Sequence, residues 1–148
     1  MNGSLCGNVR RLGLTLALAA AALLTGSCQS GRKAVYPVHG RVIDARGKGA
    51  AGAVVVLHPV DAGDKDADRP VGKTDEDGRF TLTTYNEGDG APAGEYRITI
   101  TWPAPRKSPL DPEGGDQLHG KLADSKSSTI RFTVTKGADN EVPDIRLP

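Results

Sequence analysis

The sequence predicts an all-β protein, a β-sandwich built from six or seven short strands. Apolar and polar residues alternate with a period of two in several segments after residue 35, as is typical of strands with one buried face. Turn-forming residues separate these segments, in line with the high counts of 19 glycines and 10 prolines. No segment after residue 28 reads as a convincing helix. Short, half-apolar strands at this spacing favour a sandwich.

The alternation assigns an inward face to each expected strand. The charged segment 60–72 separates two of these strands and is expected to be a loop. Thr, Arg and His, including Thr99, dominate the opposite, outward faces. The expected strands are 36–44, 53–59, 78–85, 94–103, 128–137 and 141–148. Their expected inward residues are Val38, Val42, Ala53, Val55, Leu57, Phe80, Leu82, Tyr96, Ile98, Ile100, Trp102, Ile130, Phe132, Val134, Ile145 and Leu147.

Composition narrows the class of protein. Aromatic residues make up only 4% of the chain, so the core has to be built mainly from Val, Ile and Leu. The formal net charge is +1. A nucleic-acid partner is therefore not expected, because such proteins carry a basic patch or stripe.

The first 27 residues are expected to be a signal peptide. A short basic region precedes an apolar run at 12–24, which is too short for a comfortable membrane span. The segment "LTGSC" then resembles the lipobox of bacterial lipoproteins and places the lipid on Cys28, although Thr25 stands where that motif usually has Leu. An ordinary secretory signal is the alternative. Lipidation makes the membrane a partner through Cys28 and predicts a cell-envelope location, with the leaflet undetermined.

The remaining chain divides into a tether and a domain. Residues 28–35 are expected to form a polar, lipid-anchored linker, and residues 36–148 a single domain. With Cys6 removed and Cys28 lipidated, no cysteine remains for a disulfide or a thiolate metal site.

Three motifs resemble the carboxypeptidase regulatory-like, or transthyretin-like, domain. The first contains Gly40, Val42, Asp44, Gly47, Gly52, Ala53 and Val55. The second contains Thr74, Asp75, Gly78 and Phe80, and the third Pro92, Gly94 and Tyr96. The resemblance covers about residues 38–147, and the C-terminal part is also similar to small lipoproteins of planctomycete-type bacteria. It implies a seven-stranded Greek-key sandwich whose first two strands lie in different sheets, but this fold hosts many functions.

Asp75 and Asp77 raise the question of a calcium site. In an EF-type loop with Gly78 at position 6, Lys73 would stand at position 1 and Thr84 at position 12, and neither fits. Starting the loop at Asp75 puts Arg79 at position 5. A turn in which Gly78 bends the chain and Asp75 binds backbone amides is favoured, with a weak cation site as the alternative.

No enzyme is expected. The chain lacks the C-terminal signature of hydroxyisourate hydrolases, the His-x-His of intradiol dioxygenases, a nucleophile motif and a cofactor motif. His39, His58 and His119 are expected to be surface residues; a metal shared by His39 and His58 would require their strands to pair directly.

Trp102 is the candidate ligand contact. It follows the alternation of Tyr96, Ile98 and Ile100, so it is expected to cap the core edge, but it also adjoins the long loop 103–128, where it could stack a sugar ring. The sequence therefore predicts a non-catalytic module for structural support or for recognition of an envelope protein or glycan, with a cell-surface carbohydrate-binding module as the alternative.

Overall fold

The computed structural model describes residues 31–61, 68–106, 108, 110 and 114–148. Residues Lys33–Pro148 form one compact unit. The expected signal peptide and the lipid site at Cys28 lie outside the described residues. In the described ranges, no helix is both long and apolar enough to cross a membrane.

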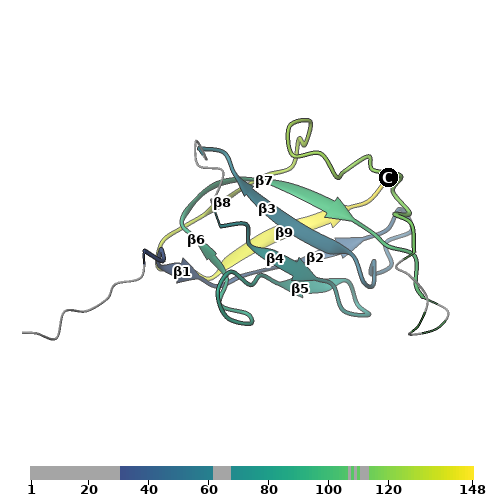
Figure 1. The fold of residues 1–148 in the computed structure, drawn as a ribbon, viewed down its shortest axis with the longest axis horizontal. Coiled ribbons are helices and arrows are strands. Elements are labelled where there is room, and N and C mark those ends of the chain that lie inside the picture. The colour runs from purple at the N-terminus through teal and green to yellow at the C-terminus, as the bar shows by residue number, and fades with distance from the viewer. Residues whose placement is uncertain (1–30, 62–67, 107, 109, 111–113) are drawn as a thin grey trace, which may run out of the picture. The chain divides into compact units, whose positions relative to one another are not determined.

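The described chain is all-β, as predicted, and its strands form three sheets (Figure 1). Strand β5 pairs with β2, which pairs with β9; a second sheet has the order β4-β3-β7-β8, and β1 pairs with β6. The strands are β1 (Val35–Tyr36), β2 (Val38–Ile43), β3 (Val54–Pro59), β4 (Val71–Lys73), β5 (Arg79–Thr81), β6 (Ala91–Pro92), β7 (Gly94–Thr101), β8 (Arg131–Val134) and β9 (Asn140–Arg146).

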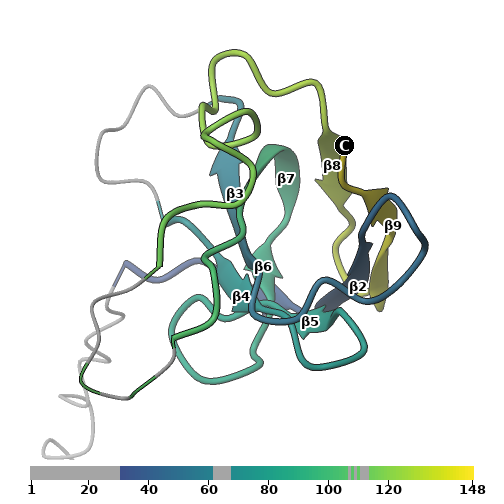
Figure 2. The same ribbon diagram turned by 90° about the vertical axis from the view of Figure 1, so that its right-hand side faces the viewer.

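The two larger sheets face each other across one hydrophobic core (Figure 2). Val42 from β2, Leu57 from β3 and Ile100 from β7 are fully buried in it. Every residue expected to point inward lies in this core or packs against it, with Trp102, Ile130 and Phe132 only partly buried. Burying each such aliphatic side chain contributes about 1.5–3 kcal/mol to the stability of the fold. The apolar positions of the alternating strands therefore provide most of the stabilisation.

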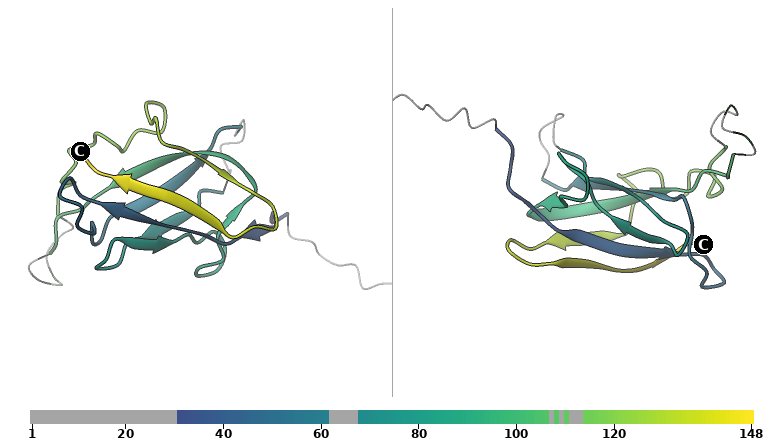
Figure 3. Two further views of the ribbon diagram at one scale, coloured as in Figure 1. Left: turned by 180° about the vertical axis from the view of Figure 1, so that it is seen from behind. Right: turned by 90° about the horizontal axis from the view of Figure 1, so that it is seen from below.

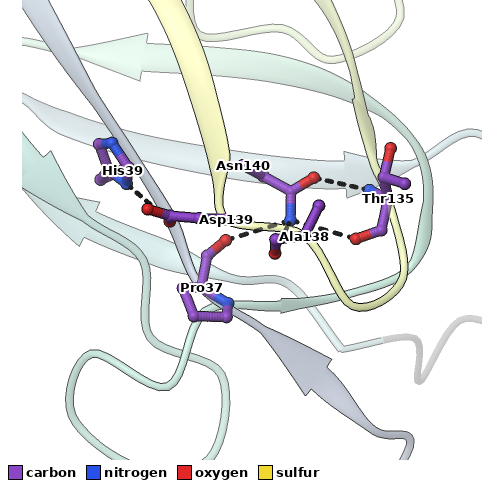
Figure 4. A network of polar contacts seen from close by, with 6 residues as sticks. All are labelled: Pro37, His39, Thr135, Ala138, Asp139 and Asn140. Carbon is purple, nitrogen blue, oxygen red and sulfur yellow. Dashed lines mark hydrogen bonds and ion pairs between the residues drawn. The ribbon is translucent and has the colours of Figure 1, made fainter.

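The first and last long strands lie side by side. β2 and β9 pair in parallel (Figure 3). The register shifts between Gly40 and Val42. The buried side chain of Asn140 joins this strand pair to the turn that precedes β9 (Figure 4). Its Nδ2 donates to the carbonyls of Pro37 and Ala138, and its Oδ1 accepts from the Thr135 amide at 2.7 Å.

The Pro-x-Gly-x-Tyr segment forms a local corner at the start of β7. The Tyr96 hydroxyl donates to the carbonyl of Pro92 at 2.7 Å. Burial raises the pKa of Tyr96 to about 12, with smaller contributions from Asp68 and Tyr85. A buried hydroxyl needs such a partner, and the bond fixes the direction in which β7 enters the core.

The structure departs from the expected strands in their number, their bounds and the burial of one outward face. Nine short strands occur in the described residues rather than the six or seven expected. The segment 60–72, expected to be a loop, contains the beginning of β4 at Val71, and this strand is too short for alternation to reveal it. Thr99 lies on the outward face of β7 but is only 4% exposed, so that face is partly covered.

Candidate functional site

A groove lies beside Trp102, and three segments distant in sequence form it. They are the turn after β2, the turn after β4 and the beginning of the long loop after β7. The groove has a volume of about 1110 Å³, slightly above the usual range for small-molecule sites. Its lining includes Lys48, Gly52, Lys73, Asp77, Trp102 and Gln117.

Trp102 is held in one orientation in this groove. Its indole Nε1 donates to the carbonyl of Ala51 at 2.9 Å, and its backbone amide donates to Asp116 Oδ1 at 2.8 Å. One part of the ring packs against the core, while the residue as a whole stays partly exposed. Trp102 therefore caps the core edge, as one interpretation predicted, and it also lines a groove; sugar stacking stays a prediction.

Asp116 holds the loop that forms one wall of the groove. Its carboxylate accepts hydrogen bonds from the backbone amides of Trp102, Leu118 and Gly120. Burial alone would raise the pKa of Asp116, but these amide bonds outweigh burial and lower it. Asp116 is thus ionised at neutral pH and stabilises this loop. The sequence did not indicate this role, because the partners of Asp116 include Trp102, 14 residues away.

The charged groups of the groove are balanced. Its cations are Lys48, Lys73 and Arg106, and its anions are Asp44, Glu76 and Asp77. The Oδ1 atom of Asp44 is already used, because it accepts from two backbone amides in its own turn. A lining with balanced charges and one aromatic wall suits a polar ligand without a large net charge.

The Asp75 segment is a turn that connects the two larger sheets. Asp75 Oδ1 accepts from the amides of Asp77 and Arg79 at 2.9 and 2.8 Å, as expected for a turn-forming aspartate. Gly78 has a φ of 79°, and Phe80 and Leu82 enter the core as expected. Across the described ranges, no group of three or more His, Cys, Asp or Glu side chains is arranged to hold a metal ion.

The histidines do not form a common site. His39 lies on β2 and His58 on β3, and these strands belong to different sheets, as the family resemblance implied. His58 is not simply exposed, because its Nε2 lies 2.8 Å from Thr99 Oγ1. Burial, and secondarily Arg69, lowers the pKa of His58. His39 Nδ1 lies 3.2 Å from Asp139 Oδ1, and His119 is exposed in the loop after β7.

No protein-family model matches the chain, and no curated protein matches it. Among solved structures, a crystal structure of a 9R-lipoxygenase from Cyanothece PCC8801 has a similar segment, with 14% sequence identity and a TM-score of 0.41. The match covers 78% of this chain and 17% of the lipoxygenase chain. A similarity this low supports no conclusion about function.

Proposed function

We propose that the protein is a non-catalytic recognition module of the cell envelope, and that it binds a glycan in the groove beside Trp102. The lipid anchor expected at Cys28 would hold the module at the membrane. The chemistry of the groove favours recognition over catalysis: the lining residues offer hydrogen-bond donors and acceptors and one aromatic wall, without an activated nucleophile beside a base.

The fixed position of Trp102 carries the glycan interpretation. An aromatic ring that is already oriented loses little conformational entropy when a sugar stacks on it. Its bond to Ala51 satisfies the indole N–H, so that stacking requires no further polar partner for the ring. The turn and loop that flank Trp102 are held by Asp44 and Asp116 through backbone amides.

A glycan array tests this proposal. The full chain should bind one or more glycans, Trp102→Ala should abolish binding, and Trp102→Phe should retain part of it because the ring remains. Arg46→Ala is a matched surface control, since Arg46 is exposed and does not line the groove. Absence of binding across the array would overturn the glycan proposal and leave structural support, the second candidate, as the better function.

The envelope location has its own test. Labelled fatty acid should enter the wild-type chain during growth but should not enter Cys28→Ala. Equal labelling of both chains would show that the lipid is not on Cys28, whatever the groove binds.

A further inference from the structure

A second hollow adjoins the Trp102 groove. It has a volume of about 990 Å³ and lies along β4 and β5, where the edges of the two larger sheets approach each other. Its lining includes Val54, Val71, Lys73, Arg79, Thr81 and Glu87. Val71 is 41% exposed and provides an apolar contact at this surface.

Lys73 connects the two hollows, because it lines both of them. It is the last residue of β4. A Cβ atom placed on Gly52 would lie 4.0 Å from Lys73 Cε, so the Lys73 side chain passes close to the backbone of the first groove. Lys73 is therefore the residue at which the two hollows meet.

The Asp75 turn forms the ridge between the hollows. Glu76 and Asp77 line the Trp102 groove, whereas Asp75 and Arg79 line the second hollow. The ridge is held in place, because Asp75 Oδ1 binds two amides of the turn and the Gly78 carbonyl accepts from the Val42 amide at 2.8 Å. The two hollows are therefore preformed relative to each other.

The charges along this surface favour an uncharged ligand. A polyanion would meet carboxylates on both sides of the ridge, and a polycation would meet lysine and arginine side chains on both sides. The carboxylates are Asp44, Asp75, Glu76, Asp77 and Glu87, and the cations are Lys48, Lys73, Arg79 and Arg106. Neutral hydroxyl groups can accept from the cations and donate to the carboxylates at the same time.

We propose that the two hollows form one extended site for a linear, neutral glycan chain, which stacks on Trp102 and crosses the Asp75 ridge beside Lys73 to reach Val71. The ligand class is thus a polysaccharide segment rather than a single sugar. This inference rests on the proposed glycan binding at Trp102 and adds the second hollow to it.

Chain length provides the test. Calorimetric titration of the full chain with cello-oligosaccharides and chito-oligosaccharides of two to six units should give an affinity that rises about tenfold or more with length, because added units enter the second hollow. The double variant Val71→Ala/Arg79→Ala should lose most of this gain and bind the disaccharide as the wild type does. Arg46→Ala should resemble the wild type at every length.

The outcomes separate this inference from the proposed function. If Trp102→Ala abolishes binding while length and the double variant have no effect, the single-groove function stands and the extended site is wrong. If Trp102→Ala has no effect, or if no glycan binds, both proposals fail. Tighter binding of an acidic series such as hyaluronan oligomers would overturn the choice of a neutral chain.

Discussion

Two turns of this molecule have the same sequence pattern and the same hydrogen bonds. In Asp44–Lys48 and Asp75–Arg79, the aspartate Oδ1 accepts from the amides two and four residues later. In both, the glycine amide donates to the aspartate carbonyl at 3.0 Å, and the glycine has a positive φ, 82° at Gly47 and 79° at Gly78. As isolated turns they are nearly identical.

They differ in what surrounds the glycine. A Cβ atom on Gly47 would have no neighbour within 4 Å. On Gly78 it would lie 2.1 Å from the Val42 carbonyl oxygen and 2.9 Å from Gly49 Cα. The first turn therefore needs glycine only for its backbone conformation, whereas the second also needs it for space. Local sequence specifies the shape of a turn, but tertiary packing decides how much stability depends on it.

Replacing the two glycines should give the largest difference in the free energy of unfolding between the two turns. An L-residue in the left-handed region costs about 1–2 kcal/mol, so Gly47→Ala should destabilise the domain by roughly that amount. Gly78→Ala adds a clash with backbone atoms and should cost about 3–5 kcal/mol or prevent folding. Urea denaturation of both variants measures the difference. Equal losses of stability in the two variants would show that the close packing around Gly78 does not make this turn more sensitive to substitution.

Removing the aspartates should have the next largest effect. Asp75→Ala leaves two amides without their acceptor, and because this turn also supports the Val42–Gly78 bond, we expect a loss of about 1–2 kcal/mol. Asp44→Ala should cost about 1 kcal/mol or less, since water can reach the amides of that exposed turn.

Asparagine is the matched control for both sites, because its Oδ1 can accept the same two bonds. Asp75→Asn and Asp44→Asn should therefore stay closer to the wild type than the alanine variants in the same urea titration. If Asp75→Asn were as unstable as Asp75→Ala, the charge rather than the acceptor geometry would be stabilising the turn.

These turns show what could be predicted from the sequence and what could not. The inward faces of the main strands followed from alternation, because one buried face of a sheet enforces a period of two. The turn at Asp75 followed from the Asp–Gly chemistry. The contact between Gly78 and the Val42–Gly49 segment could not be predicted, because the same Asp-x-x-Gly pattern at Gly47 has no such contact.

The same limit applies to the candidate site. Trp102 stood out as an aromatic residue beside a long loop, and the structure places it in a groove. Ala51 and Lys73 were missed, because they reach Trp102 and its groove only after segments distant in sequence come together. Asp116 was missed because its bond to the Trp102 amide spans 14 residues of the long loop after β7. No local pattern marks such residues in a single sequence.

Arginine contacts to the two turns should have a smaller effect than the aspartates. Arg41 Nε donates to the Asp77 carbonyl at 2.9 Å, while Arg146 NH1 approaches the Ala45 carbonyl at only 3.4 Å. Both contacts are near solvent, so Arg41→Gln should cost about 0.5 kcal/mol and Arg146→Gln less, because the longer bond is weaker. The difference should appear as a small shift in the urea midpoint, and a larger loss for Arg146→Gln would contradict this ranking.

The smallest expected effect is that of calcium. A calcium ion takes six to eight oxygen ligands, but Asp75 Oδ1 is already used by two amides, as Asp44 Oδ1 is in the other turn. Millimolar calcium chloride should therefore raise the melting temperature no more than magnesium chloride at the same ionic strength. A calcium-specific rise that Asp75→Asn or Asp77→Asn removes and Asp44→Asn keeps would show that the second turn binds a cation. Equal behaviour of the two turns would mean that both aspartates serve only the backbone, so that the Asp75 turn acts on a ligand through its shape, as a fixed ridge, rather than through a bound metal.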